Sequence, residues 1–195
     1  MNHYVLFFFL MTISPSAFAD NWSQGPGSHF DFTASAEHLP TTWSVSLDQN
    51  IAWRATLPET GQSAPVIWED RIFLTTMKPV SEDSTVGKDI VAWCLSAKDG
   101  SVLWQHEIKG QYNTKVSAPF GDASAPAAVT DGKRVWFLNP TGQIVCFDLE
   151  GNEQWSKKVT SVSRTQLVLF NGNLIFHKQH YLPDEDGGFP HKRLE

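Results

Sequence analysis

The sequence predicts an all-β protein, a β-propeller of four-stranded antiparallel blades that is incomplete, with about three blades present. A tryptophan recurs in a similar phrase at Trp53, Trp104 and Trp155, 51 residues apart each time. Short β-prone runs separated by turn residues fill the intervals between these tryptophans, four to a period as in a propeller blade. Because a repeat of this size cannot bury an apolar face alone, the faces must be buried against neighbouring copies.

The beginning of the chain is typical of a secretory signal. Residues 4–13 are apolar but too few to span a bilayer, and Ala17-Phe18-Ala19 supplies a small-x-small cleavage pattern. We therefore predict a signal peptide at 1–19, a mature chain that starts at Asp20, and a periplasmic or secreted product. No cysteine lies at the cleavage site, so no lipid anchor is indicated. A buried first strand is the alternative interpretation, which the break at Ser14-Pro15-Ser16 disfavours.

Composition limits the class of partner. The net charge of -6 lies wholly in the mature chain, and no cluster of Lys and Arg is present, which argues against nucleic acid. The content of 8 Trp and 13 Phe is ample for a packed core. We predict an extended lead-in at residues 20–50, followed by the blades at 51–195, with no membrane span.

Each repeat contains a hairpin followed by two more strands. Turn residues such as Asp131-Gly132 and Asn171-Gly172 join the predicted hairpins. The hairpins pair residues 63–67 with 71–75, 124–129 with 134–138, and 166–170 with 173–176. The strands that follow are predicted at 90–96, 101–108, 143–149 and 153–159.

Two stretches resemble the repeat of pyrroloquinoline-quinone-type (PQQ-type) β-propellers. They are VAWCLSAKDGSVLW at 91–104 and IVCFDLEGNEQW at 144–155, and the likeness runs from about Asn21 to the end of the chain. In that family an Ala-x-Asp-x-x-Thr-Gly-x-x-x-Trp motif lets the Trp of one blade dock against the next. Ordinary core packing is the alternative for any single tryptophan. The resemblance implies that the blade-docking residues are Trp53, Trp104, Trp155, Gly100 and Gly151, and we expect Trp22, near the mature terminus, to contribute far less to stability than Trp104.

The array of repeats is shorter than a closed ring requires. Propellers close with about four to eight blades, so we interpret the chain as the amino-terminal part of a larger propeller or the product of an interrupted gene. A strand at residues 51–57 is expected to complete a last blade that the sequence lacks. Unpaired strand edges seek partners, which predicts self-association of this chain.

Two cysteines occupy matching positions in successive blades, Cys94 and Cys146. A disulfide needs Cα atoms within about 7 Å, and neighbouring blades fan apart. Export permits a disulfide, but we expect two buried thiols that act as small apolar fillers. The resemblance raises one enzymatic possibility, a dehydrogenase that grips PQQ with a vicinal cysteine pair and a calcium ion. No such pair is present, so we expect no cofactor, and PQQ enters only through the resemblance.

Long connections at 76–89, 110–123 and 178–192 are predicted to leave the same face of the blades. Binding residues concentrate on long loops at one face of a rigid scaffold, although tolerated surface insertion is the alternative. The candidate binding residues are Tyr112, Lys115, Phe120, Tyr181 and Asp184.

One cluster contains residue types that bind metals, His177 and His180 followed by the acidic run at 184–186. Strand residues three apart face opposite sides, and the run lacks the alternate spacing of a calcium loop. We therefore expect a solvated turn and no metal site. The leading hypothesis is a non-catalytic, exported propeller that binds a protein or glycan partner. The alternative is the amino-terminal part of a PQQ-dependent dehydrogenase, which rests on the resemblance alone.

Overall fold

The computed structural model describes residues 21–35, 40–117, 119, 121–159 and 165–177, and every regular element among them is a strand. The predicted signal peptide lies outside these residues. No helix long and apolar enough to cross a membrane is found in the described part of the chain. The strands are β1 (Val66–Trp68), β2 (Arg71–Met77), β3 (Val86–Gly87), β4 (Ile90–Ser96), β5 (Val102–Ile108), β6 (Thr114–Lys115), β7 (Val129–Thr130), β8 (Arg134–Asn139), β9 (Gln143–Asp148), β10 (Glu153–Lys158), β11 (Val168–Phe170) and β12 (Asn173–Ile175).

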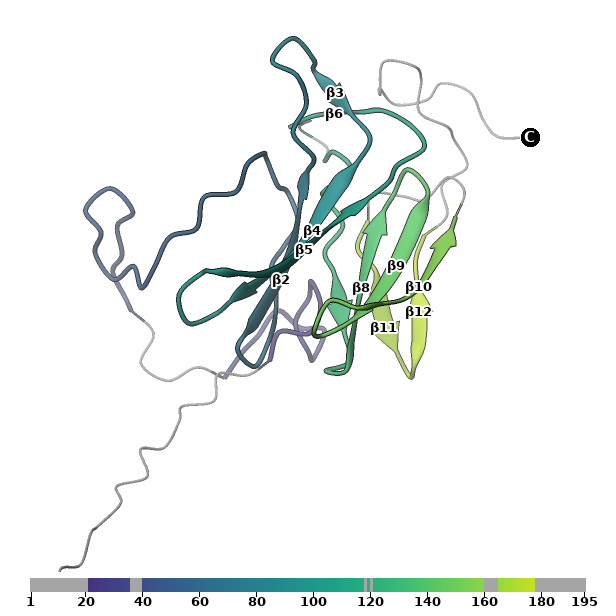
Figure 1. Ribbon diagram of the computed structural model, residues 1–195. Coiled ribbons are helices and arrows are strands. Elements are labelled where there is room, and N and C mark those ends of the chain that lie inside the picture. Colours follow the sequence, from purple (N-terminus) through teal and green to yellow (C-terminus); the bar gives the residue numbers. More distant parts are fainter. Residues whose placement is uncertain (1–20, 36–39, 118, 120, 160–164, 178–195) are drawn as a thin grey trace, which may run out of the picture.

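Eight of the strands form two blades. The first is a four-stranded sheet in the order β1-β2-β4-β5 and the second a four-stranded sheet in the order β7-β8-β9-β10, and both are antiparallel. The hairpin β11-β12 adds the first two strands of a third unit. Figure 1 shows the two sheets side by side with this hairpin beyond the second. The predicted all-β propeller architecture is confirmed, and the described sheets do not close a ring.

The middle strands are buried on both faces, as blades stacked against one another require. In β4, Ala92 and Cys94 are fully buried and Trp93 and Leu95 are nearly so. Ala92 and Cys94 belong to a core cluster that also contains residues of the second blade, such as Phe137. Strands covered on both faces read as continuous apolar runs, which explains the composition of β4 and β9. The core therefore lies between the blades.

Tryptophan rings of one repeat lie on turn glycines of the next. The Trp53 indole donates to the Ala97 carbonyl at 2.9 Å, and a Cβ added to Gly100 would lie 2.5 Å from the Trp53 ring. Trp104 repeats the arrangement, because its indole donates to the Leu149 carbonyl at 2.9 Å and a Cβ on Gly151 would lie 2.8 Å from its ring. Both glycines have positive φ. Glycine therefore suits these turns for two independent reasons, the lack of space for a Cβ and the positive φ.

A second ring-on-glycine contact, absent from the sequence prediction, lies beside the first. Trp68 ends β1, and its ring approaches Gly132 in the turn between β7 and β8. A Cβ on Gly132 would lie 2.2 Å from Trp68, and this glycine also has positive φ, at 81°. The interface between the two blades thus uses an outer turn, at Gly151, and an inner turn, at Gly132.

Two local expectations differ from the structure. Residues 51–57 form no strand, because no partner ladder lies beside them among the described residues. The inner strands are also shorter than predicted, since β1 begins at Val66 and β7 at Val129. The hydroxyls of the preceding serines instead accept hydrogen bonds from backbone N–H groups. Ser63 Oγ accepts from Thr75 N at 2.9 Å, and Ser124 Oγ accepts from Gln62 N at 3.1 Å.

Candidate binding face

Two long loops leave the same end of the first blade and pair with each other. Residues 78–89 connect β2 to β4, and residues 109–128 connect β5 to β7. Within them β3 and β6 pair antiparallel, with Val86 opposite Lys115 and Gly87 opposite Thr114 (Figure 1). The two loops thus form one unit, and we call the surface of residues 78–89 and 109–117 the loop face.

A buried threonine strengthens the pairing of the loops. Thr114 is 1% exposed, and its hydroxyl donates to the Gly87 carbonyl at 3.2 Å while accepting from Ala123 N at 3.2 Å. Gly87 lies where a Cβ would approach Met77 and Val80 at 3.0 Å each. The arm made by β3 and β6 is therefore packed down on the end of the blade.

Asp89 fixes the bases of both loops. Its carboxylate accepts from Gly110 N at 2.9 Å and from Lys109 Nζ at 3.1 Å, so the first residues of one loop are held by the last residue of the other. Burial of the Asp89 carboxyl opposes its ionisation, but the hydrogen bonds from Gly110 and Lys109 outweigh burial and lower its pKa below the usual value. Asp89 is therefore an anion at neutral pH.

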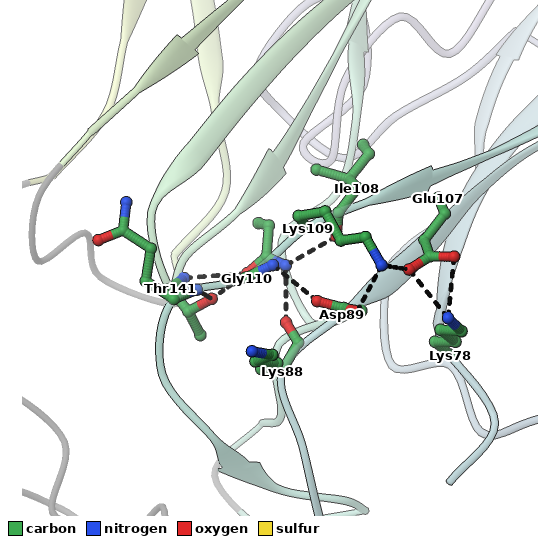
Figure 2. Close-up of polar contacts among 10 residues, drawn as sticks. Lys78, Lys88, Asp89, Glu107, Ile108, Lys109, Gly110 and Thr141 are labelled. Atoms are coloured by element: carbon green, nitrogen blue, oxygen red, sulfur yellow. Dashed lines mark hydrogen bonds and ion pairs between the residues drawn. The ribbon is translucent and has the colours of Figure 1, made fainter.

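A chain of charges runs outward from Asp89. Lys109 also contacts Glu107, and Glu107 pairs with Lys78 at 2.9 Å, as Figure 2 shows. The hydrogen bond to Glu107, followed by the one to Asp89, raises the pKa of Lys109 above its ordinary value. Alternating charges in one row hold the ends of β2, β4 and β5 together while leaving the lysines open to solvent.

The second blade clamps the same loop bases through an amide. Asn139, fully buried at the end of β8, donates to the carbonyls of Lys88 at 2.8 Å and Ile108 at 3.1 Å. Its Oδ1 accepts from Thr141 N at 3.0 Å, and Thr141 Oγ1 accepts from Gln111 N at 3.0 Å. The backbone groups of Lys88, Ile108 and Gln111 have no partner in the strand ladders at this point, and these contacts satisfy them.

The far end of the second loop is held by Asp122, whose side chain is fully buried. Its carboxylate accepts from Ser117 N at 3.0 Å and from Ser124 N at 2.9 Å, and the Ser124 hydroxyl donates to it as well. Asp122 N donates to Gln62 Oε1 at 2.7 Å, which ties this loop to the residues before β1. The loop is therefore anchored at both ends.

A hollow of about 250 Å³ lies between the first loop and the beginning of the second. Its lining residues combine apolar, polar and charged groups: Lys78, Pro79, Val80, Gly87, Lys88, Asp89 and Asn113. A hollow of this size accepts a side chain of a partner rather than a large ligand.

Two of the five candidate binding residues fall on this face. Tyr112 is half-buried and Lys115 is exposed, and both belong to the loop between β5 and β7. Phe120, Tyr181 and Asp184 lie outside the described residues, as does His180. Of the docking candidates, Trp155 is 39% exposed in β10, the last strand of the second blade. The functional roles of the binding candidates and of the docking candidates stay predictions.

Both cysteines are free thiols buried in matching strand positions, since Cys94 pairs with Phe73 across β2 and Cys146 with Trp136 across β8. Burial raises the pKa of Cys94 to about 12 and that of Cys146 to about 11. The two thiols belong to different core clusters, so they do not fit the vicinal pair that a quinone cofactor would require.

Comparison with known proteins places this architecture in a family. A family model described as "Outer membrane protein assembly factor BamB" matches residues 20–166 and, in a second overlapping match, residues 89–188. The chain belongs to this family of PQQ-like repeats. The crystal structure of BamB from Moraxella catarrhalis shares 12% identity at a TM-score of 0.37, covering 73% of this chain and 54% of that one. The chain thus spans about half the length of that protein. No match is found among curated proteins.

Sequence reasoning missed the residues that hold the loop face, namely Asp89, Asp122 and Asn139. The run Asn139-Pro140-Thr141-Gly142 predicts a tight turn, and it is one, since Gly142 N donates to Asn139 O at 2.9 Å. Nothing in the run indicates that the Asn139 side chain reaches the preceding blade. An Asn at the end of a predicted strand is the only local signal, and its burial follows only from the assembly of the blades.

Proposed function

We propose that the protein is an exported, non-catalytic propeller that binds a protein partner through the loop face. The observation that carries the proposal is the double anchoring of two long loops at one end of a blade, by Asp89 within the blade and by Asn139 from the next. The anchors satisfy backbone groups at the loop bases and also hold both loops in one conformation. Rigid loops lose less conformational entropy on binding, which favours affinity.

The chemistry of the loop face suits a protein surface. Lys88 and Lys115 are exposed there, as are Glu82 and Asp83, so the loop face carries both signs of charge, and the hollow itself is lined by Lys78, Lys88 and Asp89. A polar rim of mixed charge around a small depression is typical of interfaces between proteins that also exist apart. Glycan binding, in contrast, draws on exposed aromatic rings, and Tyr112 is half-buried.

The family supports the same class of partner. Its description as an outer membrane protein assembly factor names an activity on proteins outside the cytoplasm. The signal-like residues 1–19 agree with export. We propose that the active form is the mature protein, which begins at Asp20. Its partner and the process that it serves are proposals for this chain.

Site-specific photo-cross-linking in cells tests the proposal. A photoreactive amino acid replaces Lys88 or Lys115 on the loop face, and Lys98 or Lys133 in the turns at the opposite end of the strands as controls. All four lysines are exposed. We expect a discrete protein adduct, identified by mass spectrometry, from the first pair only. Adducts of equal yield from both ends, or none from Lys88 and Lys115, would contradict the proposal.

Export has a separate test. Cell fractionation followed by amino-terminal sequencing is expected to find the protein outside the cytoplasm with Asp20 as its first residue. A cytoplasmic chain that retains residues 1–19 would contradict the export half of the proposal and leave the binding half to the cross-linking experiment.

A further inference from the structure

The innermost strand of each unit offers a backbone N–H at an equivalent position. Ile67 pairs with Ile72, Thr130 with Val135 and Leu169 with Leu174. The contact that closes each hairpin turn lies one step further, between Trp68 and Arg71, between Asp131 N and the Arg134 carbonyl, and between Phe170 and Asn173. In an antiparallel hairpin every second N–H points away from the partner strand. These three N–H groups point away from their hairpins toward the same segment of chain.

Three consecutive residues near the mature amino terminus accept these hydrogen bonds. The carbonyl of Trp22 accepts from Ile67 N at 2.8 Å, the carbonyl of Ser23 accepts from Thr130 N at 2.9 Å, and Gln24 Oε1 accepts from Leu169 N at 3.2 Å. Trp22 N also donates back to the Ile67 carbonyl at 2.8 Å. Successive residues of one segment thus bind successive units, although Gln24 and Leu169 are 145 positions apart.

The segment fits this place closely. Gln24 is 3% exposed, and a Cβ on Gly25 would lie 1.6 Å from Gln166 Oε1. Gly27 has a φ of 84° and lies under the Trp22 ring, where a Cβ would approach the ring at 3.0 Å. The Trp22 indole donates to the Gly25 carbonyl at 3.2 Å, which folds the segment on itself. A larger residue at 27 would be strained, and one at 25 would have to displace the Gln166 side chain.

We propose that the inner edges of β1, β7 and β11 form a peptide-binding site whose ligand is this chain's own segment, residues 21–27. The segment sets the relative register of the three units by satisfying one N–H from each, at matched positions. Thr130 is buried and Ile67 and Leu169 are half-buried, and N–H groups shielded from water without acceptors are costly, so the three inner edges depend on this ligand. Trp22 is accordingly part of the fold rather than a loose terminal residue.

Hydrogen exchange on the whole chain tests the matched contacts. Gln24→Met keeps the length and burial of the side chain but removes the acceptor for Leu169 N, and Gln105→Met makes the same change on the exposed side of β5. We expect the Leu169 amide to exchange about tenfold faster in Gln24→Met, from the loss of one hydrogen bond. Gln105→Met is expected to leave it unchanged. Equal Leu169 exchange in the two variants would overturn the proposal.

A second measurement leaves the sequence of residues 21–27 unchanged. A specific protease site is inserted after the exposed Ser35, the chain is folded, and then it is cut. We expect the amino-terminal fragment to co-elute with the body on size exclusion and to exchange with a fluorescent peptide of residues 21–30. Release of the fragment together with unfolding of the body would also support the site. Release from a body whose circular dichroism is unchanged would refute it.

Discussion

Replacing Gly151 by alanine tests the contact between blades. The backbone at Gly151 has a φ of 91°, and an added Cβ would lie 2.8 Å from Cγ of Trp104 and 3.0 Å from each of the next two ring atoms. The left-handed conformation costs a non-glycine residue about 1–2 kcal/mol. Forcing the ring aside adds about 1–3 kcal/mol of overpacking. It also stretches the indole hydrogen bond to Leu149. We expect Gly151→Ala to destabilise the protein by about 2–5 kcal/mol.

Gly172→Ala is the matched control, because Gly172 has a φ of 74° and nothing within 4 Å of its added Cβ. Only the conformational cost of about 1–2 kcal/mol applies there. Urea unfolding followed by far-ultraviolet circular dichroism measures both. With a slope of about 2 kcal/mol per molar urea, an overpacking cost of about 2 kcal/mol separates the two midpoints by about 1 M. Equal midpoints would show that the ring does not depend on the missing Cβ, and would refute the docking assignment.

Three further predictions follow from the same contacts. Trp104→Ala should cost about 3–5 kcal/mol in a urea melt, whereas Trp155→Ala, at a 39% exposed residue, should cost clearly less; equal costs would contradict the docking role of Trp104. Because the folded-state pKa of Asp89 is lowered, its stabilisation is present above about pH 4 and is lost as the pH falls through that pKa. Asp89→Asn should therefore flatten the decline of the urea midpoint between about pH 5 and pH 2, and an unchanged decline would contradict this. Burial raises the pKa of Cys94 to about 12 and of Cys146 to about 11, so maleimide at neutral pH should label neither native thiol but both after denaturation without reductant. An unlabelled denatured pair would indicate a disulfide.

The repeat could be predicted from the sequence because its signals are local. A turn glycine precedes Trp104 and Trp155 by four residues, and β4 and β9 are apolar runs bounded by turn residues. Such patterns give the order of strands and the class of contact between blades. They also place the long loops at one end of the strands, since strand direction alternates along the chain.

The contacts that hold the loop face and the inner edges have no local signal. Asn139 reaches Lys88 across 51 positions, and Gln24 reaches Leu169 across 145. Which backbone groups lack a ladder partner is decided only when the blades stand together, and these side chains satisfy such groups. For the same reason the segment at 20–50, which composition describes only as a lead-in, contains at residues 21–27 the ligand of the inner strands.

A titration shows directly whether the loop face binds a protein partner. The protein recovered by cross-linking at Lys88 or Lys115 is purified and titrated against three forms of the chain: the unaltered one, Lys88→Glu with Lys115→Glu, and Lys98→Glu with Lys133→Glu. Both double variants change the net charge equally. We predict that the loop-face variant raises the dissociation constant by on the order of tenfold or more, and that the control variant leaves it unchanged. Equal affinities for the two double variants would contradict the claim.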